Sequence, residues 1–195
     1  PSDLAMIMYT SGSTGQPKGV MHNFERVSAA TDGIVKTLIE NLGDRDDNRI
    51  LSYLPLAHVF ERAWVGASSL THGRTHVYFA ESLDTFIQDL NRAKPTMFIS
   101  VPRLWLKFQQ GVFSKMPPGK LNLLLSIPLL GGVVRKKILK GLGLDHVILA
   151  GSGSAPIPAE LIVWYRKLGL NLLEGYAMTE DFAYSHNSTT QINAP

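Results

Sequence analysis

A run of eleven residues, Tyr9–Gly19, holds hydroxyl groups, glycines and one lysine directly after an apolar segment. Gly12 and Gly15 permit positive φ, so backbone N–H groups can turn toward one point. The hydroxyls add hydrogen-bond donors, and the lysine adds a mobile positive charge. Convergent N–H groups, hydroxyls and a lysine form a cradle for a polyphosphate. The side chains that could contribute are Thr10, Ser11, Ser13, Thr14 and Lys18.

The apolar segment Leu4–Met8 that precedes this run predicts a buried strand. The run is not a Walker A loop, because Pro17 and Gly19 stand where that pattern needs glycine and a serine or threonine. A bare flexible turn is the alternative. So many phosphate-binding groups directly after a strand favour the phosphate cradle.

Two further segments contain residues that could act on a bound nucleotide. Leu54–Arg62 holds one histidine, His58, although a lone histidine is often a structural residue. Glu174–Glu180 ends in Thr179 and Glu180, which by themselves would fit a helix N-cap and a solvated acid. Their position downstream of the glycine-rich run favours a role in the same site.

Taken in order, the three segments resemble core motifs of the AMP-forming acyl-adenylating enzymes, a family that includes acyl-CoA synthetases, luciferases and peptide-synthetase adenylation domains. The form of Leu54–Arg62 is similar to that of the long-chain fatty-acid CoA ligases. Weaker similarity extends to Val101–Leu104 and Gly153–Pro156, so the resemblance covers nearly the whole chain.

This resemblance implies a set of nucleotide contacts. The loop from Thr10 to Lys18 would wrap the β- and γ-phosphates of ATP, while Thr179 would hydrogen-bond the α-phosphate. Tyr176 would stack on adenine, and backbone near residue 154 would line the edge of the base. The implied nucleotide-binding residues are Thr10, Ser11, Gly12, Ser13, Thr14, Gly15, Lys18, Gly153, Ser154, Ala155, Gly175, Tyr176, Ala177, Met178 and Thr179.

The resemblance also implies which residues take part in the chemistry. Glu180 would ligate Mg²⁺, a hard cation that prefers a carboxylate, phosphate oxygens and water. His58 would lie beside the acyl carboxylate and the adenylate. Ala177 stands where the family usually has glycine, which leaves the acyl chain length open. The implied catalytic residues are Lys18, His58, Thr179 and Glu180.

The implied reaction is ATP-dependent activation of a long-chain fatty acid to acyl-AMP, with release of pyrophosphate, followed by transfer to CoA. Alternatives are an adenylating ligase for another carboxylic acid or a carrier-protein acceptor, and a non-catalytic nucleotide-binding module. The family's ribose-binding aspartate, hinge and C-terminal domain with its lysine lie outside this chain. We therefore expect residues 1–195 to form the central part of the large N-terminal domain, and activity to belong to the full-length protein.

Apolar runs alternate with helical patterns along the chain. Strands are expected at Leu4–Tyr9, Arg49–Tyr53, Thr75–Phe79, Thr96–Ser100, His146–Ala150 and Asn171–Leu173. Helices are expected from Phe24 to Leu42, with one apolar face, and between Pro158 and Gly169. This alternation predicts an α/β fold with a mostly parallel sheet and helices on both faces. Ligands would then bind beyond the carboxyl ends of the strands.

Composition narrows the class of partner. The chain is 45% hydrophobic and 18% charged, and its net charge of +3 suits anionic ligands but is too small to indicate nucleic acid. It has no cysteine, so a thioester needs a thiol from another molecule, and a reducing, cytoplasmic location with small-molecule substrates is expected. The apolar stretch Leu121–Val134 is too short to span a membrane. The basic cluster Arg135–Lys140 leaves two alternatives, a solvated face of a helix pair or peripheral contact with the inner membrane surface.

Overall fold

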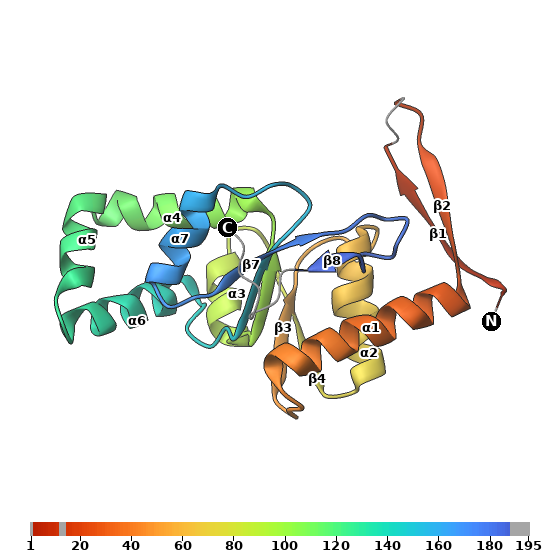
Figure 1. The fold of residues 1–195 in the computed structure, drawn as a ribbon, viewed down its shortest axis with the longest axis horizontal. Helices are drawn as coiled ribbons and strands as arrows, with labels where there is room; N and C mark the ends of the chain where they lie inside the picture. The colour runs from red at the N-terminus through yellow and green to blue at the C-terminus, as the bar shows by residue number, and fades with distance from the viewer. Residues whose placement is uncertain (1, 12–14, 188–195) are drawn as a thin grey trace.

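The computed structural model describes residues 2–11 and 15–187, and its central sheet is mostly parallel (Figure 1). Strands β5 (Met97–Ser100), β6 (Leu149–Ser152) and β7 (Leu172–Tyr176) run parallel, and the short β8 (His186–Asn187) pairs antiparallel with β7. A second parallel pair consists of β3 (Asn48–Ser52) and β4 (Thr75–Phe79). The Thr96 N–H donates to the Arg49 carbonyl at 2.9 Å, which joins this pair to the start of β5. The expected α/β fold with a mostly parallel sheet is confirmed.

Both faces of the central sheet are covered. Side chains alternate along a strand, so neighbouring residues enter different cores. Phe98, Ala150 and Leu172 belong to one buried cluster, while their neighbours Met97, Leu149 and Leu173 belong to the other. Because both residues of each pair are apolar, the strands read as continuous apolar runs, as expected of a sheet buried on both sides.

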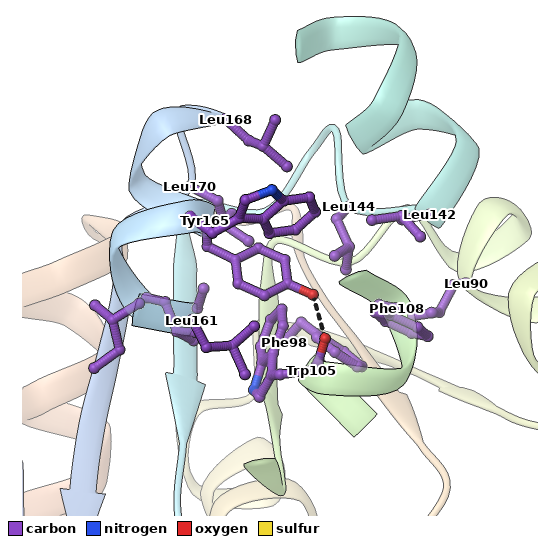
Figure 2. Close-up of a cluster of buried hydrophobic side chains, with 14 of the residues drawn as sticks. Leu90, Phe98, Trp105, Phe108, Leu142, Leu144, Leu161, Tyr165, Leu168 and Leu170 are labelled. Carbon is purple, nitrogen blue, oxygen red and sulfur yellow. Dashed lines mark hydrogen bonds between the residues drawn. The ribbon is translucent and has the colours of Figure 1, made fainter. Parts of the chain in front are cut away.

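Five helices cover the first face: α3 (Phe86–Ala93), α4 (Pro102–Lys115), α5 (Pro118–Ser126), α6 (Leu130–Leu142) and α7 (Ala159–Lys167). Figure 2 shows the aromatic centre of this core, where the rings of Trp105 and Tyr165 meet edge to face with centroids 4.8 Å apart. The buried Tyr165 hydroxyl donates to the Trp105 carbonyl at 2.7 Å, and the Trp105 indole N–H donates to the Gly151 carbonyl at 3.0 Å. These bonds hold α4 and α7 against the end of β6. Burial also raises the pKa of Tyr165 well above its usual range.

Helix α1 (Phe24–Leu42), the π-helix η1 (Glu61–Ala67) and α2 (Ser68–His72) lie on the other face. Helix α1 begins where the Asn23 side chain accepts a hydrogen bond from the Arg26 N–H at 2.9 Å. Ile34 and Leu38 on its expected apolar face are buried, whereas Phe24, at the first turn, is 58% exposed. No helix in the described part of the chain is long and apolar enough to cross a membrane.

Strand β1 (Leu4–Thr10) pairs antiparallel with β2 (Lys18–Asn23) in a separate hairpin, whose tip extends away from the body in Figure 1. The expectation of a buried strand is wrong for most of β1, in which Met8 alone is buried. Met8 is buried, but Ile7 and Tyr9 are 47% and 73% exposed, because alternate residues point to the opposite face of the hairpin. The predicted phosphate-binding residues Gly12, Ser13 and Thr14 lie outside the described residues.

Candidate functional site

An open cavity with about 720 Å³ of empty space lies at the carboxyl ends of the parallel strands. This is the place where ligands bind in sheets of this kind. Strands β5, β6 and β7, helix α1 and the segment that leads into η1 contribute its walls. Five of the residues singled out in the sequence line this one cavity: His58, Gly153, Ser154, Gly175 and Ala177.

His58 is held in a fixed orientation by the tight turn that leads into η1. Its backbone N–H donates to the Pro55 carbonyl at 2.8 Å, and its own carbonyl accepts from the Arg62 N–H at 3.1 Å. The ring Nδ1 accepts a hydrogen bond from the Phe60 N–H at 3.2 Å. In the neutral ring this assigns the proton to Nε2, which leaves a donor available to an acidic ligand.

The π-helix η1, which follows His58 in the chain, begins with a buried carboxyl group, that of Glu61. Glu61 is fully buried and accepts a hydrogen bond from the Ser52 hydroxyl at 2.5 Å, at the end of β3. Burial raises the pKa of Glu61, and the Ser52 hydroxyl partly opposes this effect. This contact fixes the segment that carries His58 to the carboxyl end of the sheet. Single π-turns of this kind are frequent at functional sites.

Residues at the ends of β6 and β7 form another part of the cavity wall. The Gly153 N–H donates to the Ser100 carbonyl at 3.1 Å, and Ser154 adopts the left-handed region with φ of +67°. A Cβ atom at Gly153 would lie 3.5 Å from the Gly175 carbonyl oxygen, so the two predicted segments are in direct contact. Ala155 is exposed and is not among the described residues that line the cavity.

Three polar residues of the cavity wall were missed by reasoning from the sequence: Thr37 and Asn41 of α1, and Ser152 of β6. Thr37 and Asn41 are one helical turn apart, and the Asn41 amide donates to the Thr37 carbonyl at 2.7 Å. Two polar residues at this spacing, beside the apolar stripe of α1, were the available signal. Ser152 directly precedes a predicted segment and is buried.

The end of the third motif forms a loop, residues 177–184, that contacts β2, η1 and, through Tyr184, helix α1. The His22 and Phe182 rings meet edge to face with centroids 5.3 Å apart, and the Trp64 indole N–H donates to the Ala183 carbonyl at 2.8 Å. Phe182 and Ala183 both have positive φ, at 55° and 58°. Such strained positions persist only where their surroundings hold them, and they cluster at functional sites. Trp64 is buried and also lines the cavity.

This loop separates the first cavity from a second, shallower one. Ala177 and Ala183 line the first, while Glu180 and Phe182 line the second together with His22. Tyr176 is 61% exposed, and neither it nor Met178, Thr179 and Glu180 is among the described residues around the first cavity. Of the residues predicted in this motif, Gly175 and Ala177 therefore line the first cavity, the predicted metal ligand Glu180 lines the second, and Tyr176, Met178 and Thr179 line neither.

The described residues of the glycine-rich run lie on the hairpin. Thr10 is paired with Lys18 across the two strands, and Gly15 has a φ of +77°. Strand alternation places Thr10 and Lys18 on the same face of the hairpin as His22, which contacts the loop beside Glu180. The face of the hairpin that carries Thr10 and Lys18 is therefore the face that contacts the loop through His22, although the described hairpin residues do not line the first cavity.

The described residues contain no group of three histidines, aspartates or glutamates arranged to hold a metal ion. A Mg²⁺ ion bound by the protein through Glu180 alone would complete its coordination with phosphate oxygens and water, which is its usual mode beside a nucleotide. The donor set present fits that mode and excludes a dedicated protein cage in the described residues.

Comparison with known proteins extends this description. The family model described as "AMP-binding enzyme" matches residues 1–194. Long chain acyl-CoA synthetase 5 of Arabidopsis thaliana is 32% identical over 207 residues, covering 94% of this chain and 31% of that protein. Human Long-chain-fatty-acid–CoA ligase 1 is also 32% identical, covering 92% of this chain and 28% of that protein. The chain thus spans less than a third of the length of these relatives.

Among solved structures, the A domain of carboxylic acid reductase from Segniliparus rugosus, in complex with AMP and a co-purified carboxylic acid, has a similar fold. Its TM-score is 0.69 at 27% sequence identity, and the match covers 91% of this chain and 28% of that one.

Proposed function

Because this chain belongs to the family of AMP-binding enzymes, we propose that the full-length protein activates a long-chain fatty acid as acyl-AMP, with release of pyrophosphate, and then transfers the acyl group to CoA. One observation carries this proposal. The cavity at the strand ends is lined both by His58 and by the contacting backbones of Gly153 and Gly175. It therefore combines a polar donor, a polar backbone edge and an apolar wall in one space.

The chemistry that such a cavity must perform is mainly positioning. A carboxylate is a poor acyl donor, and coupling to AMP turns it into a mixed anhydride with a good leaving group. That step requires the carboxylate and the α-phosphate to be held in line while negative charge is stabilised. We assign the first task to His58, whose Nε2–H is free to donate to the carboxylate or adenylate.

Charge on the phosphates would be stabilised from the neighbouring loop and hairpin. In this proposal Thr179 donates to the α-phosphate, and Lys18 binds the departing pyrophosphate from the hairpin face that points toward the loop. Glu180 would hold Mg²⁺, which supplies charge neutralisation when it is bound. CoA would bring the thiol, since this chain has no cysteine.

A second candidate is adenylation of another carboxylic acid or transfer to a carrier-protein acceptor. The likeness to an adenylation domain of a carboxylic acid reductase supports it, since the fold similarity is as extensive as the match to the ligases. Ala177 lies in the cavity wall, so its methyl group is in a position to influence which acyl group fits. A non-catalytic nucleotide-binding module would retain the cavity without turnover.

Pyrophosphate release by the full-length protein separates these candidates. It would be measured with ATP and Mg²⁺, across acids from acetate to long-chain fatty acids, with and without CoA. We expect release that requires a long-chain acid and yields acyl-CoA. Release with only short or aromatic acids would select the second candidate, and ATP binding without release from any acid would select the non-catalytic module.

Two variants test the assigned residues in the same assay. Glu180→Gln should weaken the dependence on magnesium, and Lys18→Ala should slow pyrophosphate release by at least roughly tenfold, since each removes one charge from the phosphate site. Glu160→Gln, which changes an exposed acid at the start of α7, is the matched control. An unaltered magnesium titration for Glu180→Gln would remove this residue from the metal site.

A further inference from the structure

A third and larger hollow, an apolar groove, lies on the other side of the sheet from η1, among α3, α4 and α6. It contains about 1580 Å³ of empty space that opens to solvent. In Figure 1, α5 joins α4 to α6 at one end of the molecule, and α3 lies toward the sheet. The lining residues differ from those of the nucleotide cavity and are mainly apolar, among them Phe86, Leu104, Phe108, Val112, Ile138 and Leu142.

All charged side chains that line this groove in the described residues are positive. Lys107 and Lys115 of α4 and Lys137 of α6 line it, and no carboxylate is among its described lining residues. The whole segment from Pro102 to Leu142 has no aspartate or glutamate, although the chain contains 16. It holds eight of the 19 lysines and arginines: Arg103, Lys107, Lys115, Lys120, Arg135, Lys136, Lys137 and Lys140.

None of Lys107, Lys115 and Lys137 forms an ion pair among the described residues. The acids close in sequence to the groove include Asp84, beside the lining residue Leu83, and Asp89. Asp89 of α3 is turned back toward its own helix start, where it accepts from the Thr85 hydroxyl at 2.8 Å and from the Glu81 N–H at 3.1 Å. It also faces Arg92 at 3.5 Å. The positive charge along α4 and α6 is therefore left for a ligand.

From this combination we infer that the groove binds the monomer of a single-chain anionic amphiphile, with its alkyl chain among the apolar side chains and its carboxylate or phosphate head beside the lysines. Burial of each methylene group in such a groove is favourable, and the lysine ammonium groups attract the head. A nucleotide fits less well, because its base and sugar need polar partners that an apolar groove does not provide. The inference does not depend on the proposed ligase activity, since the groove uses none of the nucleotide-site residues.

The test is calorimetric titration of the full-length protein with dodecyl phosphate below its critical micelle concentration. Inorganic phosphate and dodecanol serve as the head alone and the chain alone. We expect dodecyl phosphate to bind more tightly than either, because the groove contacts both parts. Equal affinity for inorganic phosphate would overturn the inference, since it would show that only the surface charge matters.

Glycine variants locate the binding within the molecule. Gly111 lies in α4 on the groove, and a Cβ atom there would meet nothing within 4 Å, so Gly111→Leu fills the groove without a clash. We expect it to weaken binding of dodecyl phosphate by roughly tenfold or more. Gly132→Leu in α6 is the matched control, since its Cβ position is equally open but the residue does not line the groove. Equal binding by both variants would contradict the assignment.

A pair of adjacent lysines tests the role of the head group. Lys137→Gln should weaken binding about threefold, whereas Lys136→Gln, one residue away and outside the groove, should have little effect. Pyrophosphate release should be the same in Gly111→Leu as in the unmodified protein, which separates this test from the proposed function. If only vesicles of anionic phospholipid bind, and Gly111→Leu binds them like Gly132→Leu, then the basic surface binds a bilayer and the groove proposal fails.

Discussion

Burial of the Glu61 carboxyl group makes its charged form unfavourable in the folded protein. Its side chain is fully buried, and burial raises its pKa above the ordinary value of 4.5. The folded protein therefore keeps this proton at a pH where the unfolded chain has lost it. The free energy of unfolding should thus fall as the pH rises from about 4.5 through the pKa of the folded state.

Glu61→Gln should remove this pH dependence, because an amide of the same shape keeps an oxygen for the Ser52 hydroxyl but does not ionise. Relative to the unmodified protein, the variant should become more stable as the pH rises across this window, by about 1.4 kcal/mol for each tenfold change in proton affinity. Urea denaturation at several pH values measures the difference. Glu40→Gln, on the exposed part of α1, is the control, and parallel profiles for both variants would show that Glu61 is not the group responsible.

For individual residues, the sequence predicted several members of the site, but it did not show which of them line the same cavity. His58 and Gly153 were predicted separately, and the structure brings them to one cavity. Tyr176 and Glu180 were predicted beside Ala177, yet they turn away from the same cavity. Side chains alternate along β7, so Tyr176 points to the opposite face from its neighbours Gly175 and Ala177. Glu180 lies in the loop beyond the strand, where Phe182 and Ala183 have positive φ, and no pattern of residue types shows that loop conformation in advance.

Among the secondary-structure elements, α1 and the loop that follows β7 depend on each other through a glycine. A Cβ atom at Gly33 of α1 would lie 2.7 Å from the Tyr184 hydroxyl oxygen, with ring atoms closer still. The absence of a side chain at Gly33 therefore allows Tyr184 to pack across the helix. This contact is one of three that anchor the loop carrying Thr179 and Glu180.

Gly33→Ala should have opposite effects in two backgrounds. Alanine in a helix interior is favoured over glycine by about 1 kcal/mol, so in a Tyr184→Ala background the substitution should stabilise the protein by about that amount. With Tyr184 present, displacement of the ring should cancel the gain or reverse it, and AMP binding should weaken as the loop moves. Urea denaturation of the four proteins gives the coupling energy. Additive effects would show that Tyr184 does not pack on Gly33.

The accuracy of the predicted strand bounds did not follow burial. Thr75–Phe79 was predicted with the observed bounds of β4, and Thr96–Ser100 begins one residue before β5. The strand predicted at His146–Ala150 is observed as Leu149–Ser152, because the Val147 N–H near its expected start donates to the Leu144 carbonyl in a turn. Strand β2 was not expected, since its six residues include a glycine and three polar side chains.

For the whole molecule, the most informative contrast is between the central sheet and the hairpin. Strands β5, β6 and β7 are paired within a sheet and covered by helices on both faces, whereas β1 and β2 pair only with each other. One face of the hairpin packs through Met8 and His22, while Ile7 and Met21 on the other face are 47% and 65% exposed. A two-stranded hairpin is marginally stable without such cover.

Amide hydrogen exchange should report this contrast directly. In the 195-residue chain, amides of β1 and β2 should exchange roughly hundredfold faster or more than those of β6, because opening the hairpin exposes little apolar surface and leaves the core intact. In the full-length protein the difference should shrink if the remaining chain covers Ile7 and Met21. Equal protection of β2 and β6 in the 195-residue chain would mean that the contacts of Met8 and His22 suffice to hold the hairpin. The phosphate-binding run would then be fixed in place before any nucleotide binds.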